Sequence, residues 1–566
     1  MEANGKIVSP SSNELVIGIV RAIGTDESKI IKEISYLLSN ECGYQVENVK
    51  LSALLTEVPG VGPFPVSQNK YEFYRSHMDA GDSARKLSTD YLALLGISGI
   101  AELRDSRCSD TSEDGGHRVA WIIDSLMHTT EVATFRAVYG QQFLLIGIYE
   151  EEGERRNTLR GKLSSSAQMM GLNLEEIVEE LMRRDRGIDG SEFSLNIEKT
   201  FYLSDAFVDV ADPVSNRQVP ESIVTDSGGV RLASNTPTTG LTNWTLRSLF
   251  ELIFGALYLT PTRHELAMAH ATIAAISSGS LARRVGAAIV TEEGEIVATG
   301  CNDVPAVGGG LYPVFDAGTK ALLDARDHVF RPDLPTAKDA DDGYGYDAND
   351  MVKFEIFDDL LFRMKKLELV EQDADAWTLL GQSKDLRKAQ LFDVLEYGRT
   401  VHAEMAAIIS AAHRGFSPKG LEIYVTTFPC HECARHIIAA GITKVIYLEP
   451  YPKSRVAALH YDAVVLKKEA ALSSMEARSR TQFLPFIGIA PSRLISMHSW
   501  LERKSDFGQN GFPPGRATEK AKASALSKSS RPRWSTLDTY YDDFAPARIK
   551  LSEEGVSHYL QDLGRG

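Results

Sequence analysis

The pattern that most constrains this chain is one histidine followed, further along, by two closely spaced cysteines. His402 opens the stretch HAE, and Cys430 and Cys433 stand in the stretch PCHEC; each stretch begins a predicted helix just after a turn. Cys433 lies one helical turn beyond Cys430, so both sulfurs can face one ion. One imidazole and two thiolates leave the fourth tetrahedral position of zinc for water, which is typical of a catalytic site. The fold must therefore bring the starts of two helices together.

Glu404 lies two residues after His402 and completes an H-x-E motif. Zinc lowers the pKa of a bound water to about 7. A carboxylate beside the metal can take the proton of this water and return it to a substrate nitrogen and to a leaving amine. A structural site without His402 would need two further ligands, and the five cysteines of the chain include no second close pair. We therefore predict zinc (Zn2+) as cofactor and Glu404 as the catalytic residue. The histidine and glutamate between the two cysteines are alternative ligands, which the H-x-E spacing disfavours.

The sequence around these motifs predicts an α/β domain over residues 260–500. A long acidic insertion, residues 308–399, interrupts it; this segment is too long for a plain loop and is expected to hold helices of its own. Its acidic residues include Asp339, Asp341, Asp342, Asp347 and Asp350. The other expected elements are a helix over 264–278, a hairpin over 285–300, a helix over 403–413, a strand at 421–427, a helix over 431–440 and a strand at 444–448.

Residues 1–235 predict a separate α/β domain. Its expected elements are a strand at 14–23, a helix over 28–38, a strand at 119–123, a helix over 131–139 and a strand at 143–149. Strands and helices that alternate in this way indicate a parallel sheet. Residues 212–243 are rich in Pro, Ser, Thr, Asn and Gly, which suits a link between domains, and we assign 236–259 as the connecting segment.

The first predicted strand leads into a turn where a phosphate-binding loop would lie, GIVRAIGTD. A working loop reads G-x-x-x-x-G-K-[ST]; here Gly18 and Gly24 are one residue too far apart, and Thr25 replaces the lysine. Backbone amides at the helix start can still hold an anion. Asp124, at the end of the strand VAWII, resembles the second acidic motif of nucleotide kinases. Together, Gly18, Gly24, Thr25 and Asp124 predict a degenerate P-loop, kinase-like domain with weak nucleotide-binding features. This domain could be a regulatory scaffold, a nucleotide sensor or an active kinase.

Composition excludes several classes of protein. The chain has 61 Lys and Arg against 77 Asp and Glu, and the formal net charge of −16 argues against a protein that coats DNA. The most apolar stretch, residues 246–259, falls short of the ~20 apolar residues of a membrane span. No secretory signal is visible, and sparse cysteines suit a reducing compartment, so we expect a cytoplasmic protein that does not contact membranes. Residues 501–566 form a partly basic tail, either a solvated linker or a segment that contacts RNA or nucleotide.

Four segments, HAEMAAI, TTFPCHECARHIIAAGI, KVIYL and LARRVGAAIVTEEGEIVATGCND, resemble the cytidine/deoxycytidylate deaminase superfamily and most closely its deoxycytidylate branch. This resemblance implies an α/β/α sandwich, zinc at two helix starts, and attack at C4 of cytosine with loss of ammonia. It also implies that Asn302, which matches the asparagine of the family motif G-x-N-G, contacts the sugar of the substrate. The alternative is an asparagine placed for turn formation. Asp303 stands where the family usually has glycine. In relatives this region takes part in allosteric control by nucleotides, and the sequence does not decide whether such control exists here.

The two predicted domains together resemble the bacterial anti-phage dCTP deaminases. That resemblance implies hydrolytic deamination of dCTP, and often of dCMP, to deoxyuridine nucleotides, which depletes the dCTP pool that a phage needs. It further implies a homo-oligomer restrained by a regulatory small RNA or a nucleotide effector. The alternatives are a housekeeping dCMP deaminase, or a deaminase that acts on a base within RNA or single-stranded DNA. The last would require a basic, aromatic-lined surface.

Overall fold

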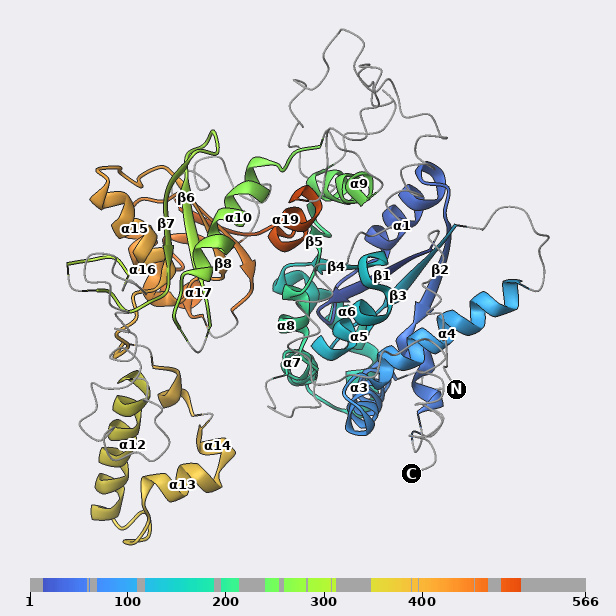
Figure 1. Cartoon of the computed structure of the whole chain (residues 1–566). Coiled ribbons are helices and arrows are strands. Elements are labelled where there is room, and N and C mark those ends of the chain that lie inside the picture. Colours follow the sequence, from blue (N-terminus) through green and yellow to red (C-terminus); the bar gives the residue numbers. More distant parts are fainter. Residues whose placement is uncertain are drawn as a thin grey trace, which may run out of the picture. The chain divides into compact units, whose positions relative to one another are not determined.

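The chain forms two compact units in the computed structural model (Figure 1). The first unit consists of residues up to Glu265 and from Pro485 onward, and the second of Leu266–Leu484. The structure describes residues 14–58, 61, 69–108, 118–187, 195–212, 240–253, 259–280, 283–306, 308–311, 348–387, 389–394, 396–451, 454–466 and 480–499. The predicted tail, residues 501–566, lies outside this set, as do Asp339, Asp341, Asp342 and Asp347 of the acidic insertion.

The first unit is built on a six-stranded sheet in the order β12-β5-β4-β1-β3-β2. Its strands are β1 (Glu14–Arg21), β2 (Gln45–Lys50), β3 (Val119–Asp124), β4 (Phe143–Tyr149), β5 (Ala206–Asp209) and β12 (Gly488–Ile489). Strands β1 to β5 pair in parallel, and β12 runs antiparallel to β5. The parallel α/β arrangement predicted for this region is confirmed.

Helices cover both faces of this sheet (Figure 1). They are α1 (Ser28–Tyr36), η1 (Leu37–Glu41), α2 (Leu51–Leu54), η2 (Leu55–Glu57), α3 (Lys70–Leu87), α4 (Tyr91–Cys108), α5 (Thr129–Tyr139), η3 (Gly140–Gln142), α6 (Glu152–Met170), α7 (Leu174–Asp185), α8 (Ile197–Tyr202), α9 (Leu241–Ile253) and α19 (Pro491–Ser499). Alternate residues of β1, such as Ile17 and Ile19, enter one core with Ile30 and Ile34 of α1. Because successive strand residues point to opposite faces, Gly18 faces the other side.

Two segments extend the first unit beyond the boundaries that composition predicts. Residues 241–253 fall in the predicted connecting segment, yet they form α9 and bury Leu246, Leu249 and Phe250 in the core of this unit. Strand β12 and helix α19 lie within the range predicted for the second domain, residues 260–500, yet their residues Ile489 and Leu494 enter the core of the first unit. The second unit therefore ends at Leu484 rather than at residue 500.

The second unit carries another six-stranded sheet, in the order β10-β11-β9-β8-β6-β7. Its strands are β6 (Gly286–Val290), β7 (Ile296–Cys301), β8 (Glu422–Thr427), β9 (Lys444–Glu449), β10 (Val464–Val465) and β11 (Thr481–Pro485). Strand β6 is antiparallel to β7 and β8, and β8 is parallel to β9. Strand β8 ends at Thr427, just before the turn that leads to Cys430, and Asp303, just after β7, forms a backbone bridge with Val401, the residue before His402.

The helices of this region are α10 (Arg263–Ile276), α12 (Ala348–Lys366), α13 (Ala376–Gln382), α14 (Lys384–Arg387), η6 (Gln390–Asp393), α15 (Ala403–His413), α16 (His431–Ala439) and α17 (Val456–Leu459). The insertion holds helices α12 to α14, as its length predicts, and Asp350 lies in the first turn of α12. None of the described helices is long and apolar enough to cross a membrane.

Candidate active site

Two helix starts meet at one end of the second sheet. Cys430 precedes the first residue of α16 after β8 and a short turn, and His402 precedes the first residue of α15. Alanines along α15 (Ala403, Ala407 and Ala411) enter the core beside the sheet. These small side chains let the helix lie close to the strands. The spacing of the motifs predicts this convergence.

The approach of α15 to β7 depends on Gly300. A Cβ atom at this position would lie 2.3 Å from the backbone nitrogen of Ala407 and 2.5 Å from the carbonyl oxygen of Ala403. Both atoms belong to the helix backbone and cannot rotate away. A side chain at residue 300 therefore has to push away the helix that carries His402 and Glu404.

We expect Gly300→Ala to lower the free energy of unfolding by about 1–3 kcal/mol, the usual cost of overpacking. Bound zinc should fall as well, because the start of α15 is displaced. Urea unfolding and metal analysis measure the two effects. Gly381→Ala in α13 is the matched control, since a Cβ atom there meets nothing within 4 Å. An unchanged stability of Gly300→Ala would contradict the backbone contact.

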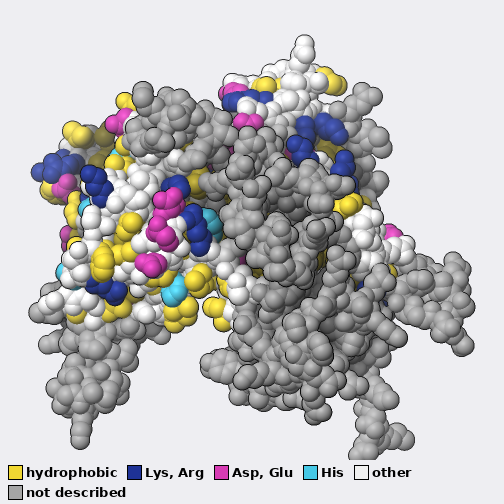
Figure 2. Space-filling model, turned by 90° about the horizontal axis from the view of Figure 1, so that it is seen from above, with side chains coloured by type: hydrophobic (Ala, Val, Ile, Leu, Met, Phe, Trp, Pro, Cys, Tyr) yellow, Lys and Arg dark blue, Asp and Glu magenta, His cyan; other side chains and the backbone are white. Residues whose placement is uncertain are grey.

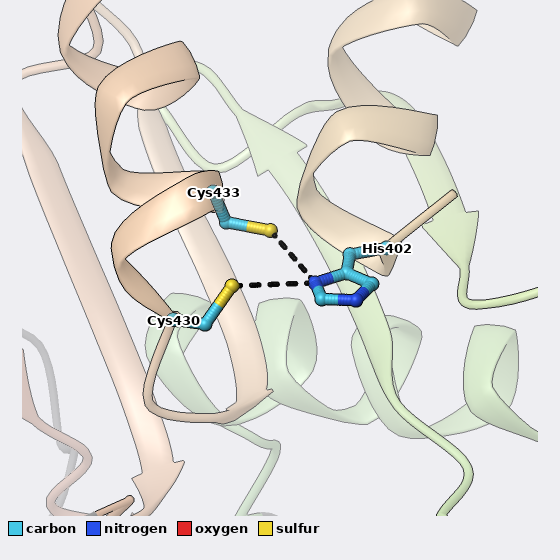
Figure 3. Close-up of side chains that lie close together, drawn as sticks. All are labelled: His402, Cys430 and Cys433. Carbon is cyan, nitrogen blue, oxygen red and sulfur yellow. Dashed lines mark hydrogen bonds between the residues drawn. The ribbon is translucent and has the colours of Figure 1, made fainter. Parts of the chain in front are cut away.

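The three predicted ligands face one another (Figure 3). Both the Cys430 Sγ and the Cys433 Sγ lie 3.3 Å from Nδ1 of His402. The two cysteines are 7% and 0% exposed, so the group is largely shielded from solvent. One nitrogen and two sulfurs at this spacing are the donor set that tetrahedral zinc accepts. The residues present therefore fit a zinc ion.

The side chains of this group also shift one another's protonation. A hydrogen bond with the Cys433 side chain lowers the pKa of the Cys430 thiol to about 4, and His402 acts in the same direction. The same hydrogen bond with Cys430, together with burial, raises the pKa of Cys433 well above its usual value. One thiolate is thus favoured without a metal, whereas the second needs a cation to replace its proton.

Glu404 lies in the first turn of α15 and is 4% exposed. Burial raises the pKa of its carboxyl group above the usual value. This carboxyl group also interacts with the Cys433 thiol, which places it at the edge of the ligand group. A buried carboxyl group with a raised pKa is suited to receiving and returning a proton near neutral pH.

The alternative ligands belong to a different cluster. The ligand atoms of His431 and Glu432 lie within 4.8 Å of each other and of Glu396, but they do not join the His402 group. Glu432 is also ion-paired with Arg435. The cluster contains no thiolate and lies closer to the surface than Cys430 and Cys433. The arrangement favours His402 as the third ligand.

The Asn302 side chain bridges two backbone groups of the preceding loop. Its Oδ1 accepts a hydrogen bond from Val285 N at 2.6 Å, and its Nδ2 donates to the carbonyl oxygen of Arg283 at 2.8 Å. These bonds agree with the alternative given above, in which Asn302 stabilises the local backbone. The contact of Asn302 with the sugar of the substrate stays a prediction. The neighbouring Asp303 forms a backbone bridge with Val401, the residue before His402.

Sequence reasoning missed the residues that hold the turn before Cys430. The Ser454 hydroxyl donates to the carbonyl oxygen of Pro429 at 2.8 Å, and Phe428 N donates to the carbonyl oxygen of Glu449 at 2.7 Å. The Glu449 carboxylate in turn pairs with Arg283 at 2.8 Å. Glu449 and Ser454 lie outside the motifs quoted above, and only the folded chain brings them to this turn.

The predicted phosphate-loop residues lie in the first unit. Gly18 lies inside β1 rather than in the turn, and a Cβ atom there would lie 2.4 Å from Cδ1 of Leu126. Gly24 does lie in the turn, with φ +89°, and packs against the backbone of Arg155. Thr25 follows it and is buried. Asp124 ends β3 and pairs with Arg21 at 3.3 Å.

Comparison with known proteins bears on the second unit. Residues 261–449 match the family model for the cytidine and deoxycytidylate deaminase zinc-binding region. The chain is 51% identical over 53 residues to ComE operon protein 2 of Bacillus subtilis (strain 168), which is 9% of this chain and 28% of that protein. It is 46% identical over 55 residues to the deoxycytidylate deaminase of Enterobacteria phage T4, which is 10% of this chain and 28% of that enzyme.

The chain thus spans less than a third of the length of the curated relatives it matches. The apo crystal structure of dCMP deaminase from cyanophage S-TIM5 matches 40% of this chain and 100% of its own, at 16% identity and a TM-score of 0.20. The family match coincides with the segment that carries His402, Cys430 and Cys433. A cytidine/deoxycytidylate deaminase domain is therefore present in the C-terminal region.

Proposed function

We propose that this deaminase domain is a working zinc enzyme that hydrolyses the amino group of cytosine in deoxycytidine nucleotides. The observation that carries the proposal is the meeting of His402 Nδ1 with both cysteine sulfurs beside the buried carboxyl group of Glu404. The reaction adds one water to cytosine and releases ammonia, leaving uracil.

Each residue has a distinct part in this scheme. His402, Cys430 and Cys433 would hold zinc, which would supply Lewis acidity and lower the pKa of the attacking water. A carboxylate oxygen of Glu404 accepts the proton of the attacking water. The same carboxyl group delivers that proton to N3 of cytosine and assists departure of the amine. Proton transfer by a positioned side chain accelerates such steps by about 10²–10⁴-fold.

The charge of the chain argues against a nucleic-acid polymer as the substrate. The net charge is −16, and on the face drawn in Figure 2 the described Lys and Arg side chains lie in small separate groups, some of them beside Asp or Glu. A deaminase that acts on a polymer needs a basic groove to hold the strand. The similarity to the deoxycytidylate deaminase of Enterobacteria phage T4 supports deoxycytidine nucleotides as the substrate class.

The finer proposal is that dCTP, together with dCMP, is the substrate and that the activity depletes dCTP during phage infection. It rests on the likeness of the fused domains to anti-phage dCTP deaminases. The central position of β1 between β3 and β4, with a glycine turn and Asp124 at the strand ends, supports a kinase-like first unit. We further propose a cytoplasmic homo-oligomer whose activity a small RNA or a nucleotide effector restrains.

A substrate comparison tests the proposal. Purified full-length protein loaded with zinc is incubated with dCTP, dCMP, CTP and a cytosine-containing single-stranded DNA, and ammonia and uracil products are followed. We expect deoxyuridine products from dCTP and dCMP at rates at least tenfold above those with the DNA. Deamination of the DNA alone would contradict the free-nucleotide assignment, and no deamination of any of the four would contradict the enzymatic one.

A further inference from the structure

Exposed apolar side chains gather on the helices of the insertion. Leu360 and Phe362 lie in α12, Leu367 and Leu369 follow it, and Trp377 lies in α13; each is between 47% and 69% exposed. Single exposed apolar side chains are ordinary on a protein surface, whereas several on one short segment mark a site of contact with another protein. The insertion therefore presents a surface suited to a protein partner.

The inner face of α12 is already packed against the rest of the insertion. The ring of Phe354 lies 4.5 Å from that of Trp377, and the ring of Phe357 lies 5.9 Å from that of Phe392. Leu361 is buried as well. These contacts hold α12 beside α13 and η6, and they fix which side of the helix stays outside. Phe362, at 54% exposed, lies on that outer side.

The charges on either side of Phe362 have opposite signs. Side chains three and four residues apart share one face of a helix. Before Phe362 these positions hold Asp358 and Asp359, and after it they hold Lys365 and Lys366. Basic residues in the last turn are favoured by the helix dipole, but two aspartates in the middle of a helix are not. The dipole therefore does not account for the acidic half of this face.

The chain itself leaves most of these charges unpaired. Asp359 pairs with Arg363 at 2.8 Å. Among the described residues, none forms an ion pair with Asp358, Lys365 or Lys366. The Lys366 Nζ lies 4.5 Å from the centroid of the Phe362 ring, so the charge and the ring belong to one surface. This surface has an apolar centre, an acidic side and a basic side.

We propose that this face of α12 pairs with the same face of a second copy of the chain, in antiparallel direction about a two-fold axis at Phe362. Residues equally far before and after Phe362 then lie opposite each other. Asp358 faces Lys366 of the partner subunit, and Asp359 faces Lys365 of the partner subunit. The two aromatic rings meet at the axis. A two-fold contact must be self-complementary, and a parallel pair would instead place like charges together.

The contact is small. A helix of 19 residues is about 28 Å long, and one pair of such helices buries less than the ~1,600 Å² of a standard interface. We therefore expect weak association that depends on protein concentration and on salt. The inference rests on the homo-oligomer proposed above and gives it a contact surface. It is independent of deamination, so its test requires no activity.

Charge reversal on full-length protein tests the pairing. One variant carries Asp358→Lys and Asp359→Lys, and the other carries Lys365→Glu and Lys366→Glu. Each then has charges of one sign on both sides of Phe362, so self-association measured by sedimentation equilibrium should weaken at least about tenfold. An equimolar mixture of the two should associate at least as tightly as wild type, because opposite charges meet across the axis. A mixture no tighter than the separate variants would overturn the proposal.

The matched control carries Glu371→Lys and Asp373→Lys in the exposed turn after α12. It changes the net charge as much as the aspartate variant does and should leave association unchanged. An equal loss would overturn the proposal by showing a nonspecific charge effect. Thermal melting checks the folding of every variant. If a double variant does not fold, the single variants Asp358→Lys and Lys366→Glu are mixed instead, with a smaller expected gain.

The same measurements separate this contact from the oligomer as such. A wild type that stays monomeric at every concentration would contradict both the homo-oligomer and the α12 contact. An oligomer that neither charge variant weakens would contradict the α12 contact alone, because the subunits would then meet through another face.

Discussion

Glu404→Gln is expected to lower the rate of cytosine deamination by at least about 10³-fold while one zinc ion per chain stays bound. Glutamine keeps the size of the side chain and an oxygen that accepts hydrogen bonds, but it cannot take up and return the proton of the attacking water. The ligand atoms of His402, Cys430 and Cys433 are unchanged. Steady-state kinetics and metal analysis on the same sample measure both quantities.

Glu422→Gln is the control for this variant. Glu422 is 5% exposed at the start of β8 in the same unit and pairs with Lys444 at 2.8 Å, away from the ligand group. Its replacement should change the rate by only a fewfold. A residual rate of Glu404→Gln close to that of wild type would mean that another group moves the proton.

Cys430→Ala and Cys433→Ala are each expected to lose both zinc and activity. With only two ligands left, the site cannot retain the metal at neutral pH, because ligand number sets the binding free energy. Deamination should fall to the background of metal-free protein. Metal analysis after gel filtration, followed by the ammonia assay, tests this.

Cys301→Ala controls for the loss of a buried sulfur. Cys301 ends β7 and is 5% exposed, but it does not belong to the ligand group. This variant should retain zinc and most of the activity. Full zinc content in both Cys430→Ala and Cys433→Ala would contradict the ligand set.

Much of the second unit follows from sequence alone, because its signals are local. The helix predicted over 403–413 is α15 with the same bounds, and the strand predicted at 421–427 differs from β8 by one residue. The metal motifs fall at helix starts, where backbone direction fixes the placement of side chains. A short spacing such as that between Cys430 and Cys433 therefore specifies geometry without knowledge of the rest of the chain.

The features that sequence could not supply depend on contacts between distant segments. Strand β12 pairs with β5, although the deaminase segment separates the two strands in the sequence. Because β12 has only two residues, its sequence shows no strand periodicity. Gly18 lies in the predicted strand and also fits the glycine motif, and only the folded chain shows that the Leu126 side chain packs against it. The carboxylate of Asp185 reaches Ile23 from a helix with no phosphate-loop motif. In each case the partner, rather than the residue itself, determines the role.

The central claim is that this chain deaminates cytosine nucleotides with one zinc ion held by His402, Cys430 and Cys433. The most direct measurement is to strip the full-length protein of metal, return zinc in known amounts, and follow uracil formation from dCTP and dCMP in water enriched in oxygen-18. The account predicts that activity rises with bound zinc and levels off at one ion per chain, with solvent oxygen at C4 of the product. Undiminished activity in the metal-free protein, or no uracil product at full zinc occupancy, would contradict it.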